Sequence, residues 1–457
     1  MAGVVGFAVG CEAQPVENAA RAELVGVTSS ALTENAITRE SFDNQGRQGN
    51  GASVTPSISP NGRYVAFQSE STVWASAIDT NGFVPQIYLK DRWVGSITLV
   101  SQVRGVVANG ASLNASVADD GSVAFVTNAT NLAPNATDPF AKVLVWQNGT
   151  IVRADVARSG EANGPSSYPQ ISGDGSSVIF QSLADNLVAG DTNEAEDVFV
   201  STGFATGAPS IRLVSITQSG APTNGSSYYG TIDYSGQVVA FASDASNIVF
   251  NDGNDATDVF AAELQSGSVR PVSFATTGFG GSVGNARSSL PQISGDGSTV
   301  VFLSFATNFQ GGDPNAYGNI YVNPVESGRS PIPVGVTSSG GFANGPSWQS
   351  AISYNGSVVA FVSAATNLID AGAPPGPPGG AAAVFVRDLI EGQTVQVDVG
   401  IAGLPLGGGA LINSSIQFSG SPSIPSPSFL VFDSASANLG WGDTNGLPDV
   451  FTASLSL

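Results

Sequence analysis

The stretch "ISGDGSSVIF" (171–180) places an Asp-Gly pair between two apolar runs. Asp-Gly in this setting is typical of a tight β-hairpin turn, because glycine adopts the positive φ angle that the turn requires. Ile, Val and Phe on either side favour strands over helices. The stretch therefore predicts two antiparallel strands joined by a short turn.

The same hairpin pattern recurs along the chain at intervals of about 60 residues, which indicates a repeat architecture. A degenerate last copy, "IQFSGSPSIPSPSFLVF", covers 416–432. The other copies are "ISPNGRYVAF" (58–67), "VADDGSVAFV" (117–126), "IDYSGQVVAF" (232–241), "ISGDGSTVVF" (293–302) and "ISYNGSVVAF" (352–361).

Two more strands follow each hairpin except the last, which is followed by one. A loop with the pattern Ala/Ser-x-Asn-Leu/Ile/Phe leads to a third strand such as "DVFVS" (197–201), and a fourth follows, such as "IRLVSI" (211–216). One four-stranded sheet is too small to bury its own faces, so neighbouring sheets must stack around a channel. The repeats therefore predict an all-β fold, a seven-bladed β-propeller of four-stranded blades.

The two ends of the repeat array complement each other. The seventh unit stops after its third strand, "DVFTASLSL" (449–457), while "ELVGVTSS" (23–30) nearly repeats "PVGVTSSG" (333–340). We therefore predict that 23–30 pairs with 448–456 and closes the ring, which would remove two unpaired sheet edges. The expected organisation is a leader or tail at 1–22 and a propeller at 23–457, with blades starting near 54, 113, 167, 228, 289, 348 and 411.

The patterns S-x-DG-x-x-V-x-F-x-S and DVFV-x-D-L, repeated through 23–457, make the chain similar to the TolB-type and WD-repeat-like propellers of bacterial envelope proteins. This resemblance implies an envelope or extracellular setting and a surface that binds other proteins. The fold itself carries many different functions.

The chain has few charged side chains and a strong excess of acidic ones. Only 11% of its residues are Asp, Glu, Lys or Arg, and 15 basic against 36 acidic residues give a formal net charge of −21. A phosphate backbone would be repelled, so nucleic-acid binding is not expected. The lysines are Lys90 and Lys142 alone, so no basic patch for a membrane surface is expected either.

The single cysteine, Cys11, ends the apolar stretch "MAGVVGFAVGC". This stretch resembles a bacterial lipobox, which would make Cys11 a lipidation site and the protein an exported, lipid-anchored lipoprotein. A plain N-terminal tail is the alternative. We expect an extracellular or cell-surface location, or the periplasm, and contact with a membrane only through such an anchor.

The chain contains no histidine. This excludes Ser-His-Asp and Cys-His catalysis and histidine-ligated metals, and leaves carboxylate chemistry. The turn carboxylates Asp120, Asp174 and Asp296 are interpreted as caps of their own hairpins. No acid–base pair stands out, so the protein is predicted not to be an enzyme.

An Asp-x-Asn-x-x-x-Asp pattern before the third strand could bind Ca²⁺, which prefers side-chain oxygens at alternate loop positions. The same residues could simply cap the loop, because Asp and Asn bind nearby backbone N–H groups. The pattern is lost in the second and sixth repeats, which favours an optional, ion-related role. The candidate calcium ligands are Asp191, Asn193, Asp197, Asp252, Asn254, Asp258, Asp313, Asn315, Asn319, Asp443, Asn445 and Asp449.

Three aromatic residues on the connectors between blades, Tyr228, Tyr229 and Trp348, are candidates for partner contacts, with core packing as the alternative. The combined prediction is a non-enzymatic, secreted or cell-surface scaffold that binds a protein, a glycan or copies of itself. One alternative is a structural subunit of an extracellular filament, sheath or surface layer. A second alternative is a carboxylate-dependent enzyme that acts on glycans.

Overall fold

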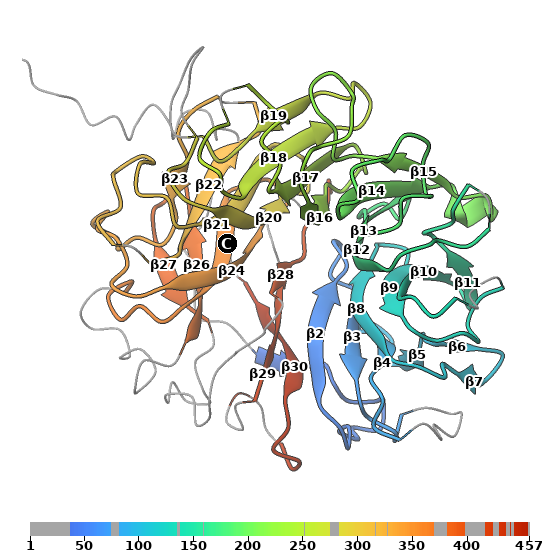
Figure 1. Ribbon diagram of the computed structural model, residues 1–457. Helices are drawn as coiled ribbons and strands as arrows, with labels where there is room; N and C mark the ends of the chain where they lie inside the picture. Colours follow the sequence, from blue (N-terminus) through green and yellow to red (C-terminus); the bar gives the residue numbers. More distant parts are fainter. Residues whose placement is uncertain are drawn as a thin grey trace, which may run out of the picture.

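The computed structural model describes residues 37–74, 82–134, 138–158, 160–250, 252–274, 283–315, 317–326, 328–369, 382–397, 416–423, 429–435, 439 and 443–455. These residues form seven four-stranded antiparallel sheets arranged in a ring (Figure 1). The prediction of a seven-bladed all-β propeller is confirmed. Among the described residues, no helix is long and apolar enough to span a membrane.

The first strand of each sheet lies nearest the centre of the ring. Each of these innermost strands contacts the innermost strand of the next blade, and the last contacts the first, so the ring is closed. In blade order they are β2 (Ser53–Ile58), β8 (Ser112–Val117), β12 (Ser166–Ile171), β16 (Ser227–Ile232), β20 (Ser288–Ile293), β24 (Ser347–Ile352) and β28 (Gln417–Phe418).

The remaining strands of each blade follow outward from the channel. The second strands are β3 (Tyr64–Ser69), β9 (Val123–Thr127), β13 (Ser177–Ser182), β17 (Val238–Ser243), β21 (Thr299–Ser304), β25 (Val358–Ser363) and β29 (Phe429–Ser434). The third strands are β4 (Gln86–Asp91), β10 (Lys142–Gln147), β14 (Asp197–Thr202), β18 (Asp258–Glu263), β22 (Asn319–Pro324), β26 (Ala383–Asp388) and β30 (Asp449–Ser454).

The outer strands are shorter, which limits the exposed sheet edge that each blade offers to other chains. They are β5 (Ile97–Leu99), β11 (Thr150–Arg153), β15 (Ser210–Leu213), β19 (Val269–Pro271), β23 (Ile332–Pro333), β27 (Thr394–Gln396) and β1 (Ile37–Arg39). A small hairpin of β6 (Gln102–Val103) and β7 (Val106–Val107) and a single 3₁₀ turn, η1 (Phe204–Thr206), complete the described elements.

The core lies between the blades and is built on one aromatic residue from each second strand. In blade three, Phe180 of β13 pairs with Phe199 of β14, and their stacked rings lie 5.8 Å apart between centroids. Both side chains are buried. Equivalent stacked pairs recur in other blades, for example Phe361 with Phe385. Burial of these large rings favours the stacked ring of sheets over isolated ones.

The hairpin and loop motifs have the structural roles that their sequences predict. Gly175 in the turn of blade three has a φ angle of 75°, which explains the glycine in the Asp-Gly pair. In the Asn-Leu loop of that blade, Asn186 accepts the N–H of Asn163 at 3.1 Å and donates to the Glu161 carbonyl at 2.9 Å. Leu187 is buried beside it. The asparagine therefore fixes the loop while the leucine fills the core.

The ring is closed by a strand from the N-terminal part of the chain, but its residues are not the predicted 23–30. β1 lies beside β30, with Ile37 opposite Ala453 and Arg39 opposite Phe451. The segment 23–30, which the sequence match assigned to this place, lies outside the described residues. β1 is the equivalent of the outer strand β23. Asn50-Gly51 follows β1 at the same distance as Asn344-Gly345 follows β23.

Candidate functional site

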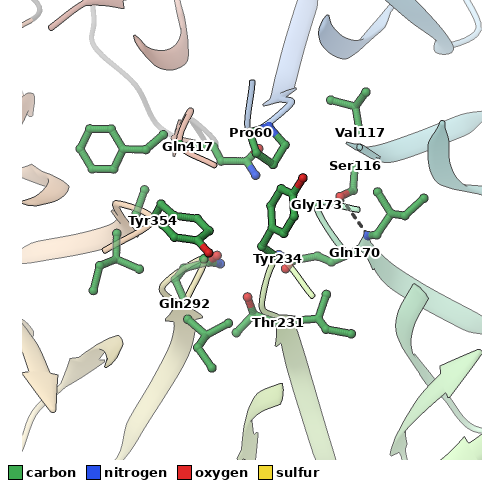
Figure 2. Close-up of a pocket in the computed structure, with 18 residues that line it drawn as sticks. Pro60, Ser116, Val117, Gln170, Gly173, Thr231, Tyr234, Gln292, Tyr354 and Gln417 are labelled. Carbon is green, nitrogen blue, oxygen red and sulfur yellow. Dashed lines mark hydrogen bonds between the residues drawn. The ribbon is translucent and has the colours of Figure 1, made fainter. Parts of the chain in front are cut away.

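The channel has a distinct mouth at the end where the hairpin turns lie. Each innermost strand is followed, two residues later, by a residue of the hairpin turn at this end, and Figure 2 labels Pro60, Gly173, Tyr234 and Tyr354 among them. In blade order these residues are Pro60, Asp119, Gly173, Tyr234, Gly295, Tyr354 and Gly420. Backbone hydrogen bonds connect the turns around the mouth, for example from the Tyr234 N–H to the Gly295 carbonyl at 2.9 Å. The mouth is therefore a rigid ring with contributions from every blade.

Two tyrosines at the mouth require glycine in the blade before them. A Cβ atom at Gly173 would lie 2.2 Å from Cδ2 of Tyr234, and one at Gly295 would lie 2.2 Å from Cδ2 of Tyr354. Such distances are far below van der Waals contact, so each tyrosine ring can lie across the neighbouring turn only where that turn carries glycine. The two rings meet edge to face, with centroids 5.9 Å apart.

The mouth opens on a cavity of about 90 Å³ that is lined by both apolar and uncharged polar residues. Figure 2 shows Gln170, Thr231, Gln292 and Gln417 around this cavity, together with the two tyrosines. Pockets for drug-sized ligands enclose roughly 300–1,000 Å³. A larger ligand would therefore bind across the mouth rather than inside the channel.

Among these seven turn residues, Asp119 alone carries a carboxyl group; it does not itself line the cavity but contacts Tyr234, which does. The Tyr234 hydroxyl donates to Oδ2 of Asp119 at 3.0 Å, and the backbone N–H of Asn61 donates to Oδ1 at 2.6 Å. Burial raises the pKa of the Asp119 carboxyl above its usual value. Burial and the neighbouring Asp119 charge raise the pKa of Tyr234 to about 12. The pair thus combines a carboxyl that binds a proton readily with a phenol that remains protonated.

The other turn carboxylates cap their hairpins, as the sequence predicted. Asp174 accepts the Ser176 N–H at 2.9 Å, and Asp296 accepts the Ser298 N–H at 3.0 Å. Asp120 accepts the Ser122 N–H at 2.8 Å. Asp119 differs because it faces a tyrosine from two blades away, and no local motif shows this contact. A signal was nevertheless present in the sequence, because Asp119 stands where the other repeats have Gly, Tyr or Pro.

The candidate calcium loop of blade three is a network of caps in this structure. Asn193 donates from Nδ2 to Asp197 Oδ2 at 2.8 Å and to the Thr223 carbonyl at 3.1 Å. Its Oδ1 accepts the Ala195 N–H at 3.1 Å, and the Ser215 hydroxyl donates to Asp197 Oδ1 at 2.6 Å. The amide oxygen is therefore used by the backbone, which agrees with the capping interpretation.

Blade four repeats this arrangement. Asn254 donates to Asp258 at 2.8 Å, and Ser273 donates to the same carboxylate at 2.6 Å. Burial, with the charge of Asp252 adding to it, raises the pKa of Asp258 to about 7. In blade three, burial and the charge of Asp197 raise the pKa of Asp191 to about 6. Each of the two loops therefore holds two neighbouring carboxylates.

The loops of blades five and seven differ in charge. In blade five, Asp313 accepts the Asn315 N–H at 2.9 Å, and the Asn319 amide lies 3.4 Å from the Asp313 carboxylate. β22 therefore begins with the neutral Asn319, whereas β14 and β18 begin with an aspartate.

In blade seven, Asp449 is balanced by Arg39, with Nε and Oδ2 3.4 Å apart. The Gln48 amide donates to Asp449 at 2.7 Å and to Asp443 at 3.2 Å, while Asn445 donates its own N–H to Asp443. This loop is completed by residues from the start of the chain.

Blade two places a lysine where blade three has Asp197. Lys142 is the first residue of β10, as Asp197 is the first residue of β14, and its side chain is fully buried. Its Nζ donates to the Phe140 carbonyl at 2.8 Å and lies 3.7 Å from the carboxylate of Asp138. An ammonium group thus occupies the strand start in blade two, and backbone carbonyls and a carboxylate surround it.

The predicted partner residues lie at the other end of the channel, where the innermost strands begin. Tyr229 meets Tyr228 and Tyr168 edge to face, with centroid distances of 5.1 and 5.5 Å. The Tyr228 hydroxyl donates to Asp244 at 2.7 Å. Trp348 is half-buried and packs against the core between the last two blades. The structure thus brings two of the three residues together and adds Tyr168, while Cys11 lies outside the described residues.

Comparison with solved structures shows this propeller in proteins of different function. An oligogalacturonate lyase from Vibrio parahaemolyticus matches with a TM-score of 0.50 at 11% identity, over 93% of this chain and 98% of that chain. An oligogalacturonate lyase in complex with manganese matches with a TM-score of 0.50 at 11% identity, over 94% and 98%.

TolB proteins, the family that the sequence resembles, are also among the structural neighbours. A putative TolB from Agrobacterium tumefaciens matches with a TM-score of 0.38 at 15% identity, over 66% of this chain and 84% of that chain. At such identities the likeness is one of fold. No protein-family model matches the sequence, and no curated protein is similar to it.

These neighbours correct the prediction that the protein is a non-enzymatic scaffold. The two lyases are enzymes, and their fold extends over 93% and 94% of this chain. The prediction that the protein is not an enzyme was therefore wrong as an inference from fold and composition. That prediction relied on finding a local catalytic motif. A propeller can build a site from one or two residues in each of several blades, and such a site leaves no motif in the sequence.

The manganese of the second lyase has no matching set of ligands in the described part of this chain. No group of three or more Cys, Asp or Glu side chains there is placed to hold a metal ion. The channel cavity is lined by Ser, Gln, Thr and Tyr rather than by carboxylates. The fit of this channel to a transition metal is therefore poor.

Proposed function

We propose that the protein is a glycan-cleaving enzyme whose active site is the channel mouth. The observation that carries this proposal is the Asp119–Tyr234 pair, a half-buried carboxyl with a raised pKa beside an aromatic ring. Raised carboxyl pKa values are what general acids need near neutral pH. Tyr234 and Tyr354 offer ring faces and edges for the apolar side of a sugar, and the nearby amides offer hydrogen bonds to its hydroxyl groups.

In the proposed reaction, Asp119 acts as the general acid. Its carboxyl group donates a proton to the glycosidic oxygen as the bond from that oxygen to the anomeric carbon breaks. A water molecule that enters from the leaving-group side adds to this carbon and gives its proton back to Asp119, because the seven turn residues at the mouth include no second carboxylate to act as a nucleophile or a separate base. Tyr234 donates a hydrogen bond to the carboxylate that forms and keeps it oriented toward the mouth.

The charge of the site favours a neutral glycan over a uronate polymer such as oligogalacturonate. No lysine or arginine is among the residues that line the described cavity. The net charge of −21 would repel a polyanion as it approaches. The substrate class is therefore proposed to differ from that named for the two lyases.

Activity assays on neutral polysaccharides test the proposal, with Asp119→Asn as the decisive variant. We expect this variant to lose activity by about 10²- to 10⁴-fold, the usual contribution of a general acid. The control is Asp296→Asn, which removes an equivalent carboxylate that caps a turn of the same ring. Equal loss in both variants, or full activity in Asp119→Asn, would contradict the assignment of Asp119.

The predicted calcium ligands support a second proposal, limited to blades three and four. The carboxylates of Asp191 and Asp197, and those of Asp252 and Asp258, would each hold one Ca²⁺ ion. The support is the comparison with blade two, where the Lys142 ammonium occupies the start of the corresponding strand among oxygen atoms.

Calorimetric titration with Ca²⁺ and thermal melts in Ca²⁺ and in EDTA test this second proposal. We expect Ca²⁺ to raise the melting temperature of the native chain, and the effect to disappear in an Asp191→Asn, Asp252→Asn double variant. Asp443→Asn is the control, because its loop is balanced by Arg39. Identical melts in Ca²⁺ and EDTA would exclude these sites.

We also propose that the protein is exported and binds a partner at its surface. An extracellular or cell-surface location is supported by the lipobox-like stretch that ends at Cys11 and by the scarcity of lysine. Contacts with a protein partner or with further copies of the chain would involve Tyr228 and Tyr229. Metabolic labelling with a palmitate analogue, in the native chain and in Cys11→Ser, tests the lipid anchor.

A further inference from the structure

A tryptophan is held exposed on the same face as the channel mouth. Trp93 lies in the turn between β4 and β5, and 71% of its surface is accessible to solvent. This turn is fixed beside the hairpin turn of blade one, because the Arg92 N–H donates to the Arg63 carbonyl at 2.9 Å. Since the hairpin turns surround the mouth, Trp93 lies on the mouth face, toward the outer edge of blade one.

The indole ring is kept in place by a stack of three side chains. The guanidinium of Arg63 lies over the Trp93 ring at 4.9 Å and over the Tyr64 ring at 4.7 Å, measured to the ring centroids. Asp91 fixes the guanidinium with an ion pair of 2.7 Å and also accepts the Trp93 N–H at 3.0 Å. The Arg63 guanidinium therefore favours one orientation of the exposed ring, which lowers the entropy cost of binding a ligand to it.

The stack connects directly to the Asp119 site. Tyr64 contacts the turn of blade two, where a Cβ at Gly121 would lie 3.1 Å from the tyrosine ring. That turn begins at Asp119, and Asn61 of blade one donates its N–H to the Asp119 carboxylate. The surface from Trp93 to the mouth thus crosses two adjacent turns without a break.

The turn itself does not need an aromatic residue at this place. The equivalent turns of blades four and five carry Gln265 and Glu326 at the position of Trp93. Single exposed apolar residues are common on protein surfaces. Trp93 differs because the Arg63 guanidinium, which is paired with Asp91, stacks on its ring while most of the ring remains exposed to solvent.

We propose that the Tyr64–Arg63–Trp93 stack is a remote sugar-binding subsite, so that the substrate is a long neutral glycan whose chain runs from the mouth across blades one and two. This inference rests on the proposed function. The exposed indole would bind the apolar face of a sugar ring by stacking, and the Arg63 N–H groups would bind its hydroxyls. Strand spacing of about 4.8 Å puts Trp93 roughly 10–15 Å from the innermost strand, a distance that only an oligosaccharide can span.

Affinity electrophoresis in gels that contain soluble β-glucan, xylan or galactomannan tests the subsite without relying on catalysis. The variants are Trp93→Ala, the conservative Trp93→Phe, and Phe250→Ala as the matched control, because Phe250 is also exposed but lies in another blade. We expect at least one polysaccharide to retard the native chain, Trp93→Phe and Phe250→Ala. Trp93→Ala should bind at least five-fold more weakly.

Retardation that is equal in Trp93→Ala and the native chain would overturn the subsite, as would the absence of retardation in every polysaccharide. Asp119→Asn separates this outcome from failure of the proposed function, because it should keep the retardation while losing activity. If Asp119→Asn stays active while Trp93→Ala loses binding, the subsite stands and the assignment of Asp119 fails. With active enzyme, Trp93→Ala should raise KM for long substrates and leave short ones unchanged.

Discussion

At the channel mouth, a single missing Cβ atom decides where a tyrosine can lie. Tyr354 covers the turn of blade five, and the three atoms nearest to a Cβ at Gly295 all belong to this tyrosine, at 2.2 to 3.0 Å. The glycine is thus required by its neighbour rather than by its own turn. A substitution in one blade can therefore be compensated in the next.

Gly295→Ala is expected to destabilise the protein by about 1–3 kcal/mol, the usual cost of overpacking. In a Tyr354→Ala background the same substitution should cost much less, because the overlapping ring is gone. Urea unfolding of the four chains in this double-mutant cycle measures the coupling. A coupling energy near zero would show that the tyrosine does not impose the glycine.

The pH dependence of activity follows from the raised pKa of Asp119. A general acid must be protonated, so kcat/KM should fall as pH rises through the pKa of this carboxyl. Because burial moves that pKa upward, the active range extends to higher pH than an exposed aspartate would allow. Tyr234→Phe removes the hydrogen bond that stabilises the carboxylate, so the falling limb should move to higher pH. A limb that stays in place would contradict the role of Tyr234.

Among the structural elements, the Asn-Leu loops are as important to the ring as the strands. Asn186 is bonded through both amide atoms to the connector between blades. We expect Asn186→Ala to lower the free energy of unfolding by about 1–3 kcal/mol, because two hydrogen bonds to the backbone of the connector are lost, each with a net contribution of about 0.5–1.5 kcal/mol. Asn148→Gly is the control. Asn148 lies in the turn between β10 and β11 and has a φ angle of 47°, which glycine adopts without steric cost. Equal stability of Asn186→Ala and the native chain would refute the role of the loop.

The repeated elements could be predicted from sequence because each is determined by residues that are close together in the chain. The Asp-Gly turns, the strands and the capping role of Asp174 all follow from residues within one hairpin. The candidate site could not be predicted in this way, because Asp119 and Tyr234 are 115 residues apart and meet only when the ring forms. Trp93 was missed for the same reason, since its support comes from Arg63 of a different hairpin.

The closing strand shows how sequence identity can mislead at the level of the whole molecule. The segment 23–30 matches 333–340 by letters, but much of that match falls in the connector after β23 (Ile332–Pro333). The strand observed beside β30 shares few letters with β23 and is found by its position before Asn50-Gly51. In a repeat protein, spacing relative to a fixed turn is therefore a better guide to an outer strand than letter identity.

β1 holds the two ends of the chain together mainly through the polar residues beside it. Ser41 donates to the buried Asp449 carboxylate at 2.6 Å, and Arg39 lies 3.4 Å from the same group. Glu40 accepts hydrogen bonds from Arg92 at 2.8 Å and from Thr452 at 2.7 Å. Without these partners, Asp449 would keep a buried charge with little compensation, and such losses cost about 3–5 kcal/mol.

Two shortened chains therefore test how the whole ring is closed. A chain that begins at residue 36 keeps β1 and should unfold at the same urea concentration as the full chain. A chain that begins at residue 43 lacks β1, Glu40 and Ser41, and should lose about 3 kcal/mol or more. It should also associate through the bare edge of β30, which light scattering would detect. If the chain that begins at residue 36 is already as unstable as the shorter one, the strand that closes the ring lies before residue 36.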